Sequence, residues 1–284
     1  MKDAGRESKL VCITLDLEAF GTDSNPKACR LLNDDKLFEQ LVAVLRKHEI
    51  KLTVFVAAKL LEETPFAIER LAVLDPEFEL HSYSHDVEDT DSHAEIEKAY
   101  SAYVNYFGKK PQGYRAPLGK ISPEGLERLA QFGFKYDSSI FPSFRPGVFN
   151  NLRASTQPFQ YQNSSLVEFP LAVIPKLRLV VSLSYLKFFG LRFYRSLFKV
   201  CGVPNPLVFC MHLNDLKNDP KALASANLPG WVKYYHARNV TKAFDIFEAF
   251  LETLKKQGYS SAYMSELYAK VAGPGTHAPG ANVL

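Results

Sequence analysis

The chain of 284 residues has little cysteine, almost no net charge and no long apolar run. Its net charge of +3 comes from 34 basic and 31 acidic residues, an imbalance too small to favour nucleic acid as a partner. Because no run of about 18 uncharged apolar residues occurs, we expect no membrane-spanning helix. Residues 1–9 are polar and charged with no apolar segment behind them, so a cleaved secretory signal is not expected either.

The four cysteines form no C-x-x-C pair, which argues against a zinc ribbon or a dithiol redox site. Cys12 and Cys210 lie inside apolar, strand-like runs, where a buried free thiol is expected. The hydrophobic fraction of 46% is enough for one large α/β domain. The Gly- and Pro-rich tail, residues 273–284, cannot bury apolar surface, so we expect one domain over residues 1–272 followed by a disordered tail.

Short apolar, β-branched runs alternate with helical patterns along the chain, and no internal repeat is present. Strands that alternate with helices favour parallel pairing, and eight such units predict a distorted parallel (β/α) barrel of seven or eight strands. The helical patterns include one from about 36 to 48 and one from about 240 to 257. The eight predicted strands are 10–16, 51–56, 78–81, 113–116, 134–137, 166–169, 207–212 and 259–263.

Two histidines, His81 and His85, stand four residues apart just after the third predicted strand. On a helical turn this spacing points both rings the same way, so that both reach one metal ion. A metal site needs at least one more protein ligand, and the best candidates are the two acids that end the first strand, Asp16 and Glu18. Without such a third ligand, a histidine pair of this kind is more often solvated or capping.

Polar and charged side chains stand at the carboxyl ends of several predicted strands, where parallel α/β barrels carry their functional loops. Polar residues also mark strand ends in general, so this placement alone is suggestive rather than conclusive. The residues concerned are Asp16, Glu18, His81, His85, Arg115, Asp137, Glu168 and His212.

Five short motifs resemble those of the NodB-homology polysaccharide deacetylases. Residues 14–18, Thr-Leu-Asp-Leu-Glu, are similar to the first motif of that family, and residues 81–85 match its H-[S/T]-x-x-H motif. Residues 115–119 match R-x-P-x-G, while residues 136–139 and 211–212 are similar to the fourth and fifth motifs. In its commonest form the first motif has two adjacent aspartates, whereas here Asp-Leu-Glu separates the two acids.

The resemblance implies a divalent metal, most consistent with Zn²⁺, held by Glu18, His81 and His85. The Asp-Leu-Glu spacing resembles atypical branches of the family in which the first acid, here Asp16, is the catalytic base and the second is the ligand. Strand geometry agrees with this, since residues i and i+2 project to the same side. The reverse assignment, with Asp16 as ligand, remains open, as does a site that works without metal.

The remaining catalytic roles also follow from the resemblance. Arg115 orients the base, and His212 protonates the leaving nitrogen. A carboxylate behind that histidine, either Asp137 or Glu168, favours its charged form.

The same resemblance implies a hydrolase that removes an N-acetyl or N-formyl group from an amino sugar of a polysaccharide, glycan or lipid-linked precursor. Candidate substrate-binding residues are Pro117, Glu168 and Trp231, the last as a sugar-stacking platform or lid anchor. Two alternatives remain open: a metal-independent amidohydrolase acting on a cyclic amide or ureide, and a non-catalytic glycan-binding module.

Residues 176–199 combine six basic residues with large apolar side chains and contain no acidic residue. This pattern is typical of a helix that lies in a membrane interface, and it predicts a cytoplasmic protein in peripheral contact with the anionic inner membrane face. The alternative is a barrel helix whose apolar face covers the sheet. The basic residues are Lys176, Arg178, Lys187, Arg192, Arg195 and Lys199.

Overall fold

The computed structural model describes residues 8–18, 31–162, 164–217, 223–224 and 229–272. The predicted disordered tail, the N-terminal segment up to residue 7 and Cys29 lie outside these described residues. Cys12 and Cys210 are buried free thiols, as predicted.

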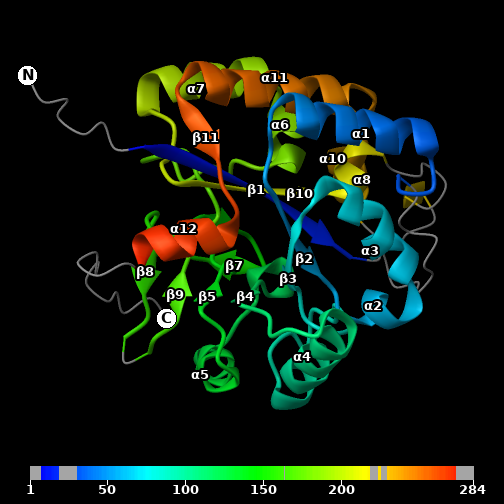
Figure 1. Ribbon diagram of the computed structural model, residues 1–284. Helices are drawn as coiled ribbons and strands as arrows, with labels where there is room; N and C mark the ends of the chain where they lie inside the picture. The colour runs from blue at the N-terminus through cyan, green and yellow to red at the C-terminus, as the bar shows by residue number, and fades with distance from the viewer. Residues whose placement is uncertain (1–7, 19–30, 163, 218–222, 225–228, 273–284) are drawn as a thin grey trace, which may run out of the picture.

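A curled, mainly parallel sheet forms the centre of the molecule, and helices surround it (Figure 1). A separate antiparallel hairpin consists of β6 (Phe144–Arg145) and β7 (Phe149–Asn150). The strands of the main sheet are β1 (Lys9–Leu17), β2 (Leu52–Val56), β3 (Glu77–Leu80), β4 (Gly113–Tyr114), β5 (Tyr136–Asp137), β8 (Phe159–Gln160), β9 (Val167–Glu168), β10 (Leu207–His212) and β11 (Tyr259–Ser261).

The helices connect these strands and cover their outer face. The short 3₁₀ helices are η2 (Ala72–Leu74), η3 (Pro117–Gly119) and η4 (Val240–Lys242). The α-helices are α1 (Asp35–Lys47), α2 (Lys59–Glu63), α3 (Pro65–Leu71), α4 (His93–Phe107), α5 (Pro123–Phe132), α6 (Leu183–Phe189), α7 (Leu191–Cys201), α8 (Leu213–Leu216), α10 (Gly230–Ala237), α11 (Ala243–Lys256) and α12 (Met264–Val271).

The eight predicted strands are all present, and the predicted distorted barrel is confirmed as a half-barrel. The order β10-β1-β2-β3-β4-β5-β9-β8 runs across the sheet, and β11 pairs with the start of β1. No pattern in the sequence predicts β8, which pairs antiparallel with β9, or the β6-β7 hairpin. The side between β9 and β10 is spanned by irregular chain, in which the N–H of Ala172 donates to the carbonyl of Val208.

Alternate residues of each long strand face opposite sides of the sheet, and this alternation separates the core into two parts. Ile13 and Leu15 of β1 pack outward in the large cluster that includes the helices. Cys12 points inward, where it joins Phe55 and Tyr136 in the filling of the barrel. Asp16 and Glu18 have the same parity as Cys12, so both acids arrive at the inner, carboxyl end of the strand.

None of the helices in the described ranges is both long and apolar enough to cross a membrane. This agrees with the expectation from the sequence.

Candidate functional site

The predicted site residues on β1, β3, β4 and β10 converge at the carboxyl ends of these parallel strands. The pairing register places Asp16 of β1 directly beside His212 of β10. His81 follows β3, and Arg115 follows β4, the next strand in the sheet. The topology therefore brings together residues that are up to about two hundred positions apart in the chain.

Glu18, His81 and His85 form a compact cluster in which one ligand atom of each residue lies within 4.8 Å of the others. The Nε2 atom of His81 lies 3.4 Å from Oε2 of Glu18, and Nε2 of His85 contacts the same oxygen. The two imidazole centroids are 5.1 Å apart. Glu18 thus lies where a third ligand could join the histidine pair.

The two histidines do not lie on a helical turn, so that part of the prediction is wrong. Residues 81–86 form a loop in which Ser82 and His85 both have positive φ, 59° and 62°. One carboxylate oxygen of Glu95, on α4, organises this loop by accepting hydrogen bonds from the N–H groups of Tyr83 and Ser84 and from the Ser84 hydroxyl. The loop geometry, rather than helical periodicity, brings the two rings together.

The donor set fits a divalent cation such as Zn²⁺, which commonly takes two histidines and one carboxylate in catalytic sites. The Nδ1 atom of His81 lies 2.7 Å from the carbonyl oxygen of Arg115, a contact that fixes Nδ1 as the protonated nitrogen. The Nε2 atom is therefore the one with a free lone pair, and it is the atom that faces Glu18.

The charges in this cluster respond to one another. Burial disfavours the charged form of Glu18, but His85 and His81 outweigh it and hold the pKa of Glu18 well below its usual range. Burial likewise opposes charge on His85, yet Glu18 raises the pKa of that ring. A cation bound among the three side chains would replace the two imidazole rings as the partner of the Glu18 carboxylate.

Asp16 is paired with a buried arginine, as the sequence suggested. The NH1 atom of Arg115 lies 2.6 Å from Oδ1 of Asp16 and donates also to the hydroxyl of Thr14, at 2.7 Å. Burial alone would raise the pKa of Asp16, but Arg115, His81 and His212 lower it. Asp16 is therefore an ionised carboxylate with one oxygen, Oδ2, left for other partners.

The fourth motif supports Arg115 rather than contacting the site directly. Ser138 accepts from Nε of Arg115 through its carbonyl and from NH2 through its hydroxyl, both at 3.0 Å. The ring of Phe55 lies under the guanidinium, 4.1 Å away. Ser139 accepts a hydrogen bond from the N–H of Ala116, which fixes the backbone that follows Arg115.

A second group of ligand atoms, from Asp16, Cys210 and His212, also lies within 4.8 Å. This group suits a cation less well, because the guanidinium of Arg115 is already paired with Asp16. The thiol of Cys210 lies 3.3 Å from Oδ2 of Asp16 as a donor. Burial and the charge of Asp16 raise the pKa of this thiol well above its usual value, so it stays neutral.

His212 is backed by Asp215, a residue that our sequence analysis missed. The Nδ1 atom of His212 lies 3.4 Å from Oδ2 of Asp215, which also accepts from the backbone N–H of His212, and Nε2 lies 3.8 Å from Oδ2 of Asp16. Burial alone would lower the pKa of His212, but Asp215 and Glu18 raise it to about 9. The only trace in the sequence is the spacing H-x-x-D at the start of a short helix.

Asp215 is in turn held by α6. Its Oδ1 atom accepts from the Ser184 hydroxyl at 2.6 Å and lies 3.4 Å from Nζ of Lys187. The side chain of Lys187 is only 1% exposed, so this lysine, predicted to face a membrane, is instead an internal counterion. Burial disfavours the charged form of Asp215, but His212 and Lys187 lower its pKa below the usual range.

Asp137 and Glu168 were predicted to stand behind His212, but Asp215 takes that position; Glu168 was also predicted to bind substrate. They are opposite one another on β5 and β9, and both are fully buried. Glu168 accepts from the N–H of Ile140 and the hydroxyl of Tyr161, while Asp137 accepts from Ser139. Burial and the charge of Asp137 raise the pKa of Glu168 well above its usual value.

Pro117 and Trp231, the other predicted substrate-binding residues, occupy contrasting positions. Pro117 is buried at the start of η3. The turn needs glycine two residues later, because Gly119 has φ +68° and an added Cβ would lie 2.5 Å from the carbonyl oxygen of Ser139. Trp231 is 66% exposed on α10, so it is free to contact a partner outside the fold.

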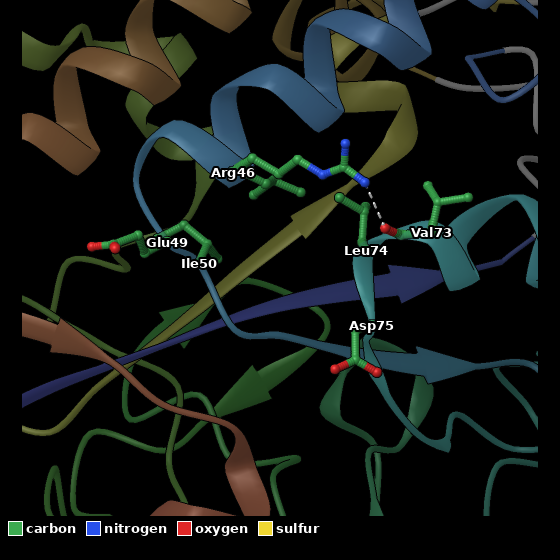
Figure 2. A pocket seen from close by; sticks show the side chains of 7 residues that line it. Arg46, Glu49, Ile50, Val73, Leu74 and Asp75 are labelled. Carbon is green, nitrogen blue, oxygen red and sulfur yellow. Dashed lines mark hydrogen bonds between the residues drawn. The ribbon is translucent and has the colours of Figure 1, made fainter.

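Two cavities lie beside other parts of the chain. One of about 500 Å³ is lined by residues in or near the third motif and after the second, among them Val87, Gly119 and Lys120. The other, of about 310 Å³, lies between α1 and η2, where Arg46 donates to the carbonyl of Val73 (Figure 2). No predicted site residue lines either cavity.

Comparison with known proteins gives one family match, to polysaccharide deacetylase over residues 5–136. Among curated proteins, "Peptidoglycan deacetylase-like protein FGM2" of Gibberella zeae is 26% identical over 156 residues. That alignment covers 49% of this chain and 46% of the relative, so the chain spans less than half the length of this relative. The resemblance predicted from the motifs is confirmed.

Solved structures of similar fold include a Mycobacterium smegmatis protein assigned to the polysaccharide deacetylases, with a TM-score of 0.61, 17% identity, and 98% and 95% of the two chains covered. The allantoinase Puue has a TM-score of 0.62 at 11% identity, with coverage of 95% and 92%. A CE4 family pseudoenzyme from Bacillus anthracis has a TM-score of 0.52 at 15% identity, with coverage of 92% and 66%. At these identities the likeness establishes the fold alone.

The contacts of His212 generate a prediction about its protonation. In metal-free protein, we expect Asp215→Asn to lower the pKa of His212 by about 1 to 3 pH units, because an opposite charge at this range favours the imidazolium by that amount. We expect Lys187→Met to move the pKa the other way, since it leaves Asp215 without its second cation. NMR titration of the His212 ring measures both, and an unchanged midpoint in Asp215→Asn would contradict the assignment.

Proposed function

We propose that this chain, whose residues 5–136 match the polysaccharide deacetylases, is a metal-dependent hydrolase that removes an N-acetyl or N-formyl group from an amino sugar. Its substrate would be part of a polysaccharide, a glycan or a lipid-linked sugar precursor. The observation that carries the proposal is the juxtaposition of three elements: the Glu18, His81 and His85 donors, the Asp16–Arg115 pair, and His212.

Hydrolysis of an amide needs an activated water, a stabilised oxyanion and a proton for the departing nitrogen. In the proposed mechanism a divalent cation, when bound by Glu18, His81 and His85, supplies Lewis-acid polarisation of the acyl carbonyl. Asp16 accepts the proton of the attacking water, and Arg115 keeps that carboxylate ionised and oriented. Its second oxygen, Oδ2, accepts from the thiol of Cys210 and is the atom that faces His212.

His212 completes the mechanism as the general acid. The hydrogen bond to Asp215 favours the imidazolium, which then donates its Nε2 proton to the leaving nitrogen. The exposed fractions of the side chains support this direction of approach, because His212 is 30% and His85 22% exposed whereas Asp16 is only 6%. Substrate would therefore enter across the two histidines, with the base at the bottom of the site.

The two alternatives have different support. The metal-independent alternative, a reaction on a ureide, is supported by the fold of an allantoinase, because that likeness extends over most of the chain. Against that, the convergence of two imidazole nitrogens on one carboxylate favours a cation. A non-catalytic module is disfavoured because every catalytic role has a residue in contact distance of its partner.

The first test is release of acetate or formate from N-acylated saccharides, with the metal content measured on the same protein. We expect activity to disappear on chelation and to return on addition of Zn²⁺, with about one metal ion bound per chain. His81→Ala and His85→Ala should each lose the metal and stay folded, because both side chains lie at strand ends outside the apolar core. Stoichiometric metal in either variant would contradict the ligand assignment.

A second test separates the two acids of the first motif. Asp16→Asn should keep the metal and lower kcat by about 10²- to 10⁴-fold, the usual contribution of a general base. Glu18→Gln should lose most of the metal, because a neutral amide is a far weaker ligand than a carboxylate. The opposite pattern, with metal lost in Asp16→Asn and kept in Glu18→Gln, would exchange the two roles.

A further inference from the structure

We infer that α6, α7 and α10 present a docking surface for an anionic lipid bilayer. The structure revises the basic stretch predicted over residues 176–199, because two of its members are used inside the fold. Lys187 is buried against Asp215, and Arg178 donates to the carbonyl of Ala154. The surface that remains is built from aromatic and basic side chains of the three helices and of Arg238 just after α10, and we call it the basic aromatic face. Its members are exposed except for Phe188, which is half-buried. It comprises Phe188, Phe189, Arg192, Phe193, Arg195, Lys199, Val200, Trp231, Tyr234 and Arg238.

The aromatic side chains of this face form a continuous strip. Phe193 of α7 stacks near Phe189 of α6, with centroids 5.5 Å apart, and Phe189 contacts Phe188 at 4.9 Å. Phe188 reaches Tyr234 of α10 at 6.2 Å. Trp231 lies one turn before Tyr234 on the same helix. Exposed aromatic side chains joined across three helices are unusual on a monomeric surface and mark an interaction site.

The alternative, that α7 is only a covering helix of the barrel, explains part of its sequence. Leu191, Tyr194 and Phe198 face inward and are buried. It does not explain why Phe193 is 42% and Val200 84% exposed on the same helix. The apolar surface of α7 is therefore larger than the fold itself uses.

The positive charges of the face are not neutralised. Neither Arg192 nor Lys199 forms an ion pair with any residue that the structure describes. Arg195 donates to the hydroxyl of Thr253 and the carbonyl of Ala249, which are uncharged. Of the acids on α11, which packs against α7, Glu248 pairs with Lys47 of α1.

The chemistry of the face favours a bilayer over a soluble sugar chain. The sequences of α6, α7 and α10 contain no Asp, Glu, Asn or Gln. Those side chains provide the paired donors and acceptors that fix sugar hydroxyls, and their absence leaves apolar groups and cations. Aromatic residues beside Arg and Lys are the composition of interfacial helices on anionic membranes.

The basic aromatic face also adjoins the candidate site. Ser184 and Lys187 of α6 contact Asp215, and Asp215 contacts His212, the proposed general acid. The basic aromatic face is therefore connected to His212 through α6. Figure 1 shows α6 and α10 next to α8, which begins directly after the strand that ends in His212. A protein docked in this way would hold the site close to the lipid headgroups. The inference stands on this surface alone and does not depend on the proposed hydrolase activity.

The test is binding of the full chain to vesicles of phosphatidylcholine, with and without phosphatidylglycerol, at low and high salt. Trp231 is the single tryptophan of the chain, so its emission and its quenching by brominated acyl chains report on this face directly. We expect cosedimentation with anionic vesicles, quenching of Trp231, and weaker binding at high salt because of screening. The double variant Arg192→Glu, Lys199→Glu should bind at least about thirtyfold more weakly.

Two further variants make the result specific. The double variant Phe189→Ala, Phe193→Ala should also weaken binding to anionic vesicles. The double variant Lys109→Glu, Lys110→Glu makes the same charge change on an exposed loop outside the face, and it should leave binding unchanged. Circular dichroism verifies that each variant is folded. Equal binding by the two charge variants, or no preference for anionic lipid, would overturn the inference. So would a Trp231 signal that responds to soluble N-acetylated oligosaccharide and not to vesicles.

Discussion

The buried ion pair between Arg115 and Asp16 is the interaction on which the rest of the site depends. A guanidinium that is 1% exposed is tolerable only if its donors are satisfied, and here Asp16, Thr14 and Ser138 accept from all three nitrogens. The same arginine contributes its backbone carbonyl to His81, which sets the tautomer of a proposed metal ligand. The positions of Asp16, the proposed base, and of His81, the proposed ligand, therefore both depend on Arg115.

Much of this arrangement follows from the period of two in the strands. Alternation in β1 predicts that Asp16 and Glu18 share a face with Cys12, and the structure places all three inward. Parallel pairing then predicts that polar residues at the ends of different strands meet. These two rules, with the alternation of strands and helices, predicted a distorted barrel with polar strand ends at one edge, whereas the roles of Arg115 and His212 beside Asp16 came from the family resemblance.

The remainder depended on contacts that no local pattern reports. Ser82 and His85 have positive φ values in a loop that is held by Glu95 of α4 and by the Ser82 hydroxyl, which accepts from the N–H of His85, so the expected helical turn is absent. Asp215 replaces the predicted carboxylates Asp137 and Glu168 behind His212, since those two are buried opposite one another on β5 and β9. A stretch of six basic residues likewise gave no indication that Lys187 would turn inward.

We propose that Glu18, and not Asp16, joins His81 and His85 as a metal ligand. Crystals soaked with Zn²⁺ and measured on both sides of the zinc absorption edge test this directly. We expect one anomalous peak bounded by Oε2 of Glu18 and the two Nε2 atoms, with Asp16 still paired to Arg115. A peak among Asp16, Cys210 and His212, or a first shell that includes Asp16 in place of Glu18, would contradict it.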